Sequence, residues 1–217
     1  FGEEKIMAFK DNFRGDSAYT QIMTKIFNIF WLSILWLLCC IPVITIGAST
    51  IALYYVMLKL VKDEETTVTR EFFHSFKQNF LQSLPVTVIV LVVVVVLVAD
   101  FHILGAAGRA QGASFMYGFC IVLGIICAAV FSYVFPLLAK FENTVKKTFE
   151  NGARLAASHI GQTLVITVVN LFPVLWFLIS PQTFSAIFWI WVFVGGGVQA
   201  FVNSLFLVKI FDRLAEA

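Results

Sequence analysis

The residues best suited to chemistry are neutral polar side chains inside long apolar segments. Asn170, Gln199 and Asn203 lie in the last two such segments, and Thr167 lies three residues before Asn170. Gln199 and Asn203 are one helical turn apart, and Thr167 shares the helical face of Asn170. An amide inside a bilayer costs free energy unless it is hydrogen-bonded. Two interpretations stay open: hydrogen bonds that hold helices together, and a site for a transported solute.

Small and hydroxyl-bearing residues form a second patch in the apolar segment 43–61. The polar members of this patch are Ser49, Thr50 and Tyr54. Because small residues let membrane helices approach closely, Gly47 and Ala48 predict a notch for helix packing. A second close crossing or a local kink is predicted for three consecutive glycines, which are Gly195, Gly196 and Gly197.

The sequence contains no set of residues that predicts an enzyme. A catalytic nucleophile needs a neighbouring base, and a metal ion needs several Cys, His or acidic ligands. The three histidines are far apart, and only Asp100 and His102 form a close pair, on different sides of a predicted helix. The four cysteines lack metal-binding spacing. We therefore expect a non-catalytic protein with no metal and no other cofactor.

The composition is that of a membrane protein. Hydrophobic residues make up 60% of the 217 residues, and charged residues make up only 13%. So little polar surface excludes a soluble globular protein and predicts several membrane-spanning helices in a lipid bilayer. A net charge of +2 is too small to indicate a nucleic-acid partner.

The apolar segments predict an all-α, polytopic bundle of six membrane helices arranged as three hairpins. A crossing needs about 20 apolar residues, and the run 28–61 can hold two that are joined at Pro42. The expected crossings are 26–40, 43–61, 81–104, 114–138, 161–179 and 184–208. The single membrane domain 1–217 would comprise a cytoplasmic or interfacial segment 1–25, a first hairpin 26–61, an amphipathic helix 62–80, a second hairpin 81–138, an amphipathic segment 139–159, a third hairpin 160–208 and a cytoplasmic tail 209–217.

The distribution of Lys and Arg predicts the orientation of the bundle. With six crossings, 14 cationic residues lie on the side of both termini, and only Arg109 lies on the other side. Because cytoplasmic loops carry an excess of Lys and Arg, both termini are expected in the cytoplasm. Pro42 and Gly47 keep one alternative open, in which 43–61 does not cross and five crossings remain.

Two charged stretches, 62–80 and 139–159, carry aromatic stripes. Their Phe residues recur at helical spacing opposite charged side chains. Such a stripe predicts either a helix in the membrane interface or a helix that docks on a protein partner. The candidate docking residues are Phe72, Phe73, Phe76, Phe80, Phe141 and Phe149.

Residues 45–56, TIGASTIALYYV, and residues 72–80, FFHSFKQNF, resemble closely the signature of the YesL-like bacterial membrane proteins. That family has no established molecular function, and its members look like companions of carbohydrate ABC transporters. The resemblance implies an accessory or regulatory subunit in the bacterial cell membrane, partnered by the permease or ATPase subunits. An alternative stays open: a carrier or binding protein for a sugar or oligosaccharide that acts on its own. A homo-oligomer is also compatible with the sequence.

Overall fold

Helices account for all regular structure in the residues that the computed structural model describes, which are 18–64, 66–106 and 113–215. Six of them are long and apolar enough to cross a membrane. These spans are Tyr19–Cys40, Val43–Val61, Val68–Leu104, Phe115–Lys140, Ile160–Ile179 and Pro181–Leu214. The predicted all-α, polytopic bundle is therefore confirmed. Most of the predicted segment 1–25, and the loop with Arg109, lie outside the described residues.

The first hairpin consists of α2 (Ala18–Cys40), the short 3₁₀ helix η1 (Val43–Thr45) and α3 (Ile46–Val61). Helix α2 begins eight residues before the predicted first crossing. Pro42 separates the two long helices because proline lacks the N–H that would continue α2. The Thr45 hydroxyl donates to the Pro42 carbonyl at 2.6 Å and also bonds the Cys39 carbonyl, so acceptors at the end of α2 are satisfied.

The second hairpin corrects one predicted boundary. The amphipathic helix 62–80 and the crossing 81–104 were expected as separate elements, but they form one helix, α4 (Val68–Ala106). Pro85 lies inside α4. The hydroxyls of Ser83 and Thr87 donate to nearby backbone carbonyls in this turn, and such bonds help a membrane helix tolerate a proline. At 1.5 Å per residue the 39 residues of α4 extend about 58 Å, well beyond the roughly 30 Å hydrocarbon layer.

Helix α5 (Ala113–Lys140) returns alongside α4 and is followed by the amphipathic helix α6 (Val145–Ser158). The third hairpin consists of α7 (Ile160–Ile179), α8 (Pro181–Ile190), the π-helical turn η2 (Trp191–Gly195) and α9 (Gly196–Ala215). The turn predicted at residues 180–183 is shorter in the structure, because α8 already begins at Pro181. Proline suits the first position of a helix, where its missing N–H has no intrahelical partner.

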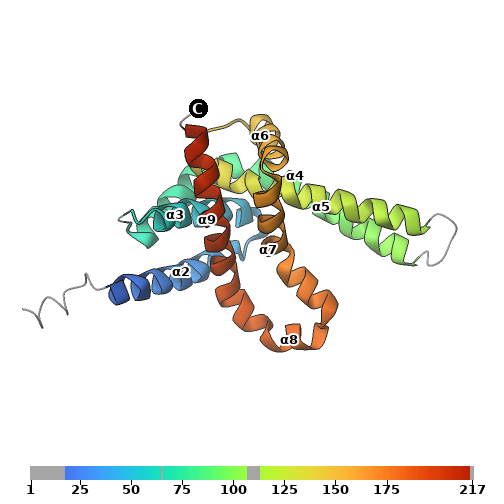
Figure 1. Ribbon diagram of the computed structural model, residues 1–217, viewed down its shortest axis with the longest axis horizontal. Helices are drawn as coiled ribbons and strands as arrows, with labels where there is room; N and C mark the ends of the chain where they lie inside the picture. Colours follow the sequence, from blue (N-terminus) through green and yellow to red (C-terminus); the bar gives the residue numbers. More distant parts are fainter. Residues whose placement is uncertain (1–17, 65, 107–112, 216–217) are drawn as a thin grey trace, which may run out of the picture.

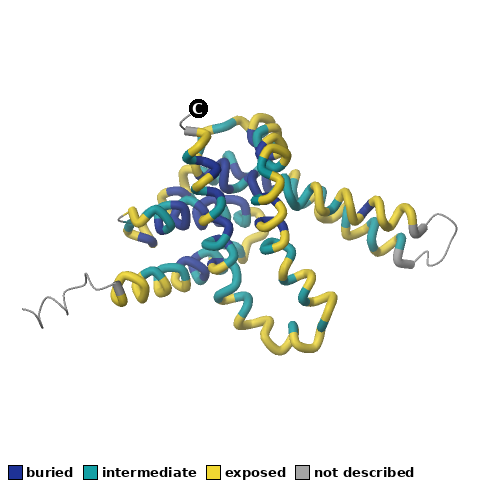
Figure 2. Tube along the Cα trace, viewed as in Figure 1, coloured by how far each residue is buried: buried dark blue, intermediate teal, exposed yellow. Residues whose placement is uncertain are grey.

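Two apolar arms leave a common core (Figure 1). The first arm, residues 88–106 and 113–131, contains the paired outer parts of α4 and α5. The second arm, residues 168–196, contains the outer part of α7 with α8 and η2. Both arms are mostly exposed, and the buried residues gather where α3, α9 and the inner parts of α4 and α5 meet (Figure 2). Large core side chains include Leu32, Ile51, Met57, Phe72, Tyr133 and Phe211.

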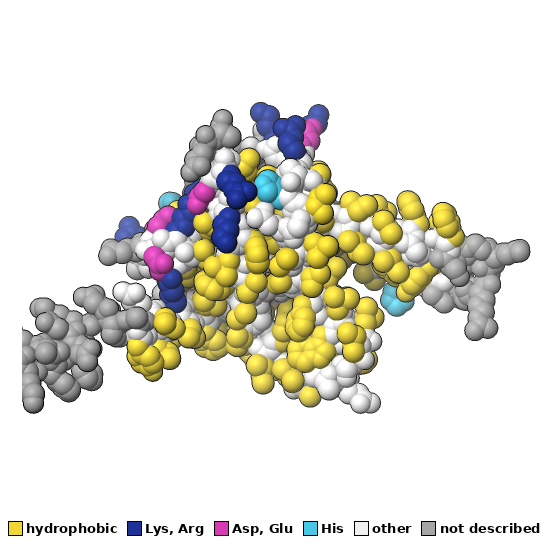
Figure 3. Space-filling view, in the orientation of Figure 1, with side chains coloured by type: hydrophobic (Ala, Val, Ile, Leu, Met, Phe, Trp, Pro, Cys, Tyr) yellow, Lys and Arg dark blue, Asp and Glu magenta, His cyan; other side chains and the backbone are white. Residues whose placement is uncertain are grey.

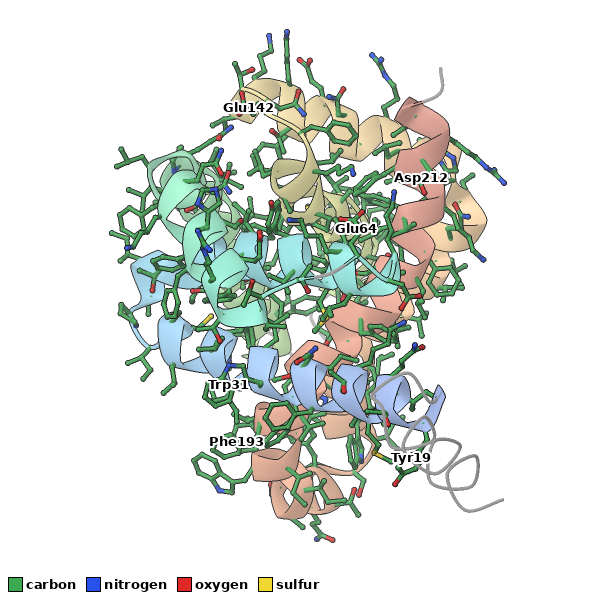
Figure 4. The ribbon with its side chains drawn as sticks, turned by 90° about the vertical axis from the view of Figure 1, so that its left-hand side faces the viewer. Tyr19, Trp31, Glu64, Glu142, Phe193 and Asp212 are labelled. Carbon is green, nitrogen blue, oxygen red and sulfur yellow. The ribbon has the colours of Figure 1, made fainter. Side chains whose placement is uncertain are left out.

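Charged side chains gather at the end of the bundle away from the arms, here named the charged end. In the space-filling view they lie at the upper left and the top centre, whereas the arms are covered mainly by hydrophobic side chains (Figure 3). Glu64, Glu142 and Asp212 all lie in the upper half of the rotated view, and Phe193 of η2 lies in the lower half (Figure 4). Ion pairs tie this end together: Lys59 Nζ lies 3.0 Å from Glu71 Oε2, and Lys62 pairs with Asp212.

Replacing Gly197 by Ala should destabilise the contact between α9 and α2. The added Cβ would lie 1.9 Å from Ser33 Oγ and 2.8 Å from the Ile29 carbonyl oxygen, and a backbone carbonyl moves only if its helix moves. Overpacking of this kind costs about 1–3 kcal/mol. Thermal unfolding of the purified protein in detergent should therefore show a lower Tm.

Gly124→Ala is the matched control, because nothing lies within 4 Å of the Cβ that it would add. Alanine favours the helix by about 1 kcal/mol over glycine, so this variant should keep or raise the Tm. Equal Tm values for the two variants would contradict the close approach of α9 to α2.

Candidate functional site

Asn170 of α7 is the centre of a hydrogen-bond network that joins four helices. Its Oδ1 accepts from Gln199 Nε2 at 2.8 Å and from Asn203 Nδ2 at 2.7 Å, both on α9. Its Nδ2 donates to Ser132 Oγ on α5 at 2.7 Å. Asn203 Nδ2 also donates to the Tyr54 hydroxyl on α3, at 3.1 Å. Four of the residues singled out in the sequence, Tyr54, Asn170, Gln199 and Asn203, are therefore in contact.

The network lies near the middle of the membrane-spanning part of α7. Asn170 follows the first residue of that helix, Ile160, by ten residues, which corresponds to about 15 Å, half of a typical hydrocarbon thickness. Three hairpins contribute to it, since α3, α5 and α7 with α9 belong to different ones. The network lies at the depth of the hydrocarbon layer, where hydrogen bonds between helices help to hold the hairpins together.

Two buried polar atoms beside the network have no hydrogen-bond partner within the described part of the chain. They are Oδ1 of Asn203, whose side chain is fully buried, and Oγ1 of Thr167. Leaving such an atom unpaired costs about 1–3 kcal/mol. Thr167 was predicted on the face of Asn170, and the structure buries it without placing it in the network.

A cavity of about 370 Å³ lies where the two arms leave the core, and we name it the fork cavity. Membrane helices from all three hairpins contribute to its wall. Its polar lining includes Thr50, Tyr54, Ser132, Asn170 and Gln199. Its aromatic lining consists of Trp36, Phe131, Phe135, Trp191 and Tyr54. The network therefore forms one wall of a space large enough for a small ligand, within the usual range of about 300–1,000 Å³ for ligand pockets.

Sequence patterns did not identify the tryptophans or Ser132 as members of this site. Trp36 and Trp191 lie in apolar segments, and only contacts between helices bring them to one cavity. Trp36 Nε1 donates to Thr50 Oγ1 at 3.2 Å. The Trp36 ring also packs so closely on α9 that a Cβ added at Gly196 would lie 2.7 Å from it. One signal was available: tryptophan usually prefers the membrane interface, and both of these lie deeper.

The remaining residues of the sequence-predicted patch serve packing in the structure. Ser49 is fully buried, and its hydroxyl donates to the carbonyl of Thr45, one helical turn earlier, at 2.9 Å. Ala48 is also fully buried. A Cβ at Gly47 would lie 1.9 Å from Thr87 Oγ1 on α4, so α3 and α4 approach closely there. In the second arm, a Cβ at Gly195 would meet the ring of Trp191 at 2.7 Å.

Most Phe residues of the two stripes pack against other helices of the chain and are not available to a protein partner. The prediction that Phe72 docks on another protein is wrong, because its side chain is fully buried in the core and stacks on Phe76. Phe141 packs edge-on against Phe211, and Phe149 packs against Phe131. The spacing of an aromatic stripe is the same whether the stripe packs within its own bundle or docks on a partner, so the sequence alone could not distinguish the two. Phe76 and Phe80 are half-buried, and Phe73 is the exposed member of the set.

A groove of about 380 Å³ lies at the charged end, and we name it the charged-end groove. Apolar side chains from α5, α6 and α9 form its floor together with Phe141. Its lining includes Leu137, Phe141, Glu142, Asn151, Arg154 and Leu214. The groove thus combines an apolar floor with one acidic and one basic side chain.

Histidine, cysteine and acidic side chains do not gather in threes anywhere in the described ranges. Asp100 and His102 lie near the outer end of α4, far along the first arm from the fork cavity. The chemistry available in the fork cavity is therefore hydrogen bonding by neutral groups and contact with aromatic rings.

Asn170→Leu should destabilise the bundle by about 2 kcal/mol, because it removes three interhelical hydrogen bonds of about 0.6 kcal/mol each. Leucine has a similar size, so packing is largely kept. Thermal unfolding in detergent measures the loss. Ser132→Ala, which removes one of the three bonds, should lower the stability by about a third as much. A loss for Asn170→Leu no larger than for Ser132→Ala would contradict the central place of Asn170.

Comparison with known proteins finds one family. The sequence profile of a family described as "Protein of unknown function, DUF624" matches residues 29–101. This range covers the second half of α2, all of α3 and most of α4, and it includes Trp36, Thr50 and Tyr54 of the fork cavity. Neither the curated proteins nor the solved structures yielded a match to the chain. Over residues 29–101, the chain is similar to this family.

Proposed function

We propose that this chain is a non-catalytic integral membrane protein that serves as an accessory or regulatory subunit of a carbohydrate ABC transporter in the bacterial cell membrane. The resemblance of residues 45–56 and 72–80 to the YesL-like proteins supports this role, and both motifs lie inside the range 29–101 that the family profile matches. A six-span helical membrane protein is the kind of molecule that can pack beside a permease.

The charged-end groove is the observation that carries this proposal. Its apolar floor is partly open, since Leu214 is 44% exposed, and Glu142 and Arg154 offer one charge of each sign. A helix or loop with an apolar anchor and both charges fits such a groove, because buried anchors supply affinity and rim charges supply specificity. We assign it to a cytoplasmic segment of the permease or ATPase subunit.

The proposed orientation places this groove on the cytoplasmic side. With six crossing helices, the side that holds the termini and the charged end carries 14 Lys and Arg residues, and the opposite side carries one. This excess favours a cytoplasmic charged end and cytoplasmic termini. The ATPase subunits of such transporters use cytoplasmic ATP, so a groove on that side can reach them.

Arg154→Glu should reduce co-purification of the transporter subunits about tenfold. Charge reversal at the groove removes one favourable rim charge and adds a repulsive one, a change worth roughly 1.4 kcal/mol. The measurement is affinity purification of the tagged, full-length protein from its native membrane in mild detergent, with quantitative mass spectrometry of the bound proteins.

Lys147→Glu is the matched control, since Lys147 is an exposed cation on the same helix that does not line the groove. It should leave co-purification unchanged. Equal losses for the two variants would show a general charge effect and contradict the groove. A wild-type protein that purifies without transporter subunits would contradict the accessory role itself.

A second candidate role is favoured by the network of Asn170, Gln199 and Asn203 beside the fork cavity. In this role the chain itself is a small-solute carrier or binding protein for a sugar or an oligosaccharide. Neutral polar groups at the middle of a helical bundle are typical of solute sites in transporters.

A further inference from the structure

The fork cavity has a neutral lining. None of the described residues that line it is Asp, Glu, Lys, Arg or His. An ionic ligand placed there would lose its hydration without gaining a countercharge, which is strongly unfavourable in a medium of low polarity. The lining therefore selects against phosphates, carboxylates and amines, and it favours an uncharged ligand.

Hydrogen-bonding capacity at the cavity wall is left unused. Gln199 donates to Asn170 through Nε2, but its Oε1 has no partner among the described residues. The Tyr54 hydroxyl accepts from Asn203, and its own proton has no acceptor in the same part of the chain. A ligand with several hydroxyl groups can donate to Gln199 and accept from Tyr54 at the same time.

Aromatic rings supply the other half of the lining. Trp36 and Trp191 both line the cavity, and Phe131 and Phe135 lie on α5. Tryptophan offers a large, rigid apolar face at low cost in conformational entropy. A sugar ring has both properties that this cavity would recognise, because it carries hydroxyl groups at its edge and apolar C–H bonds on its faces.

We propose that the fork cavity is a binding site for one neutral sugar ring, held by hydrogen bonds to Gln199 and Tyr54 and by contact with Trp36 and Trp191. The bases of both arms line the fork cavity, and it shares no lining residue with the charged-end groove. This inference rests on the second candidate function and is independent of docking at the charged-end groove.

A second cavity extends the site. A largely apolar cavity of about 430 Å³ between α7 and α9 shares Trp191 and Gln199 with the fork cavity. A sugar that carries an apolar substituent can fill both spaces, with its ring against Gln199 and its substituent among the valines of the second arm. Free sugars and alkyl glycosides therefore share one recognition chemistry, and the experiment separates them.

The test is titration of the purified, full-length protein with uncharged sugars, followed by tryptophan fluorescence and by thermal unfolding. The detergent must lack a sugar head group, because an alkyl maltoside would compete for the site. The probes are glucose, galactose, mannose, xylose and N-acetylglucosamine, and octyl glucoside below its micelle-forming concentration. Concentrations up to about 10 mM cover the affinities usual for transported and metabolised solutes.

At least one free sugar should change the fluorescence and raise the Tm in parallel. Trp191→Phe should reduce the fluorescence change, the remainder coming from Trp36, whereas Trp189→Phe should keep it in full. Trp189 is the matched control, since it is 68% exposed on the same arm and does not line the fork cavity. Gln199→Leu should weaken the affinity about tenfold, the size expected for a lost hydrogen bond to a desolvated hydroxyl.

Tyr54→Phe is a second variant in case Gln199→Leu fails to fold, and it removes only the hydroxyl group. A similar loss of affinity for that variant supports the site. Binding of octyl glucoside without binding of any free sugar would overturn the sugar site in favour of a lipid-like ligand. Absence of both signals across the panel, or signals unchanged in all three cavity variants (Trp191→Phe, Gln199→Leu and Tyr54→Phe), would overturn it outright. None of these outcomes depends on transporter subunits, so they are separate from the test of docking.

Discussion

Satisfying polar groups at the depth of the hydrocarbon layer is the constraint on which the rest of this structure depends. Inside a bilayer an amide finds partners only in neighbouring helices or in a ligand. Asn170 meets this constraint through bonds to Ser132, Gln199 and Asn203: the bond to Ser132 joins the second and third hairpins, and the other two join α7 to α9 within the third. Tyr54 adds the first hairpin through Asn203. The three hairpins thus converge on one point, and beyond it each arm is free to diverge.

Divergence of the arms separates two surfaces with different chemistry. The charged end holds its ion pairs and a groove with an apolar floor, and Figure 3 shows how sharply this end differs from the apolar arms. The fork cavity lies on the other side of the network and contains no charge among its described lining residues. Helix α9 runs from one to the other, with Gln199 near the cavity and Leu214 at the groove. A protein partner and a small solute could therefore act on the same helix.

Much of this arrangement could be predicted from the sequence, and the exceptions have physical reasons. Apolar segment lengths predicted six spans, and the spacing of Gln199 and Asn203 predicted that they share a face. The continuity of α4 could not be predicted, because Pro85 marks a boundary in most helices and is tolerated here within a membrane-spanning one. The burial of Phe72 depends on which side of α4 meets the core. The place of Trp36 depends on the close approach of α2 to α9 at Gly196 and Gly197: the three glycines predicted a close crossing or a kink there, but not which helix would pack against them.

If the fork cavity is a solute site, water must reach it, and substituted-cysteine labelling measures this access most directly. In a background with the four native cysteines replaced, Ala128→Cys places a thiol in the cavity wall, and Val95→Cys places one on the exposed surface of the first arm. A membrane-impermeant thiol reagent needs water to reach and ionise its target. The account predicts that Ala128→Cys reacts with such a reagent and Val95→Cys does not. Equal protection of both positions in intact membranes would contradict it.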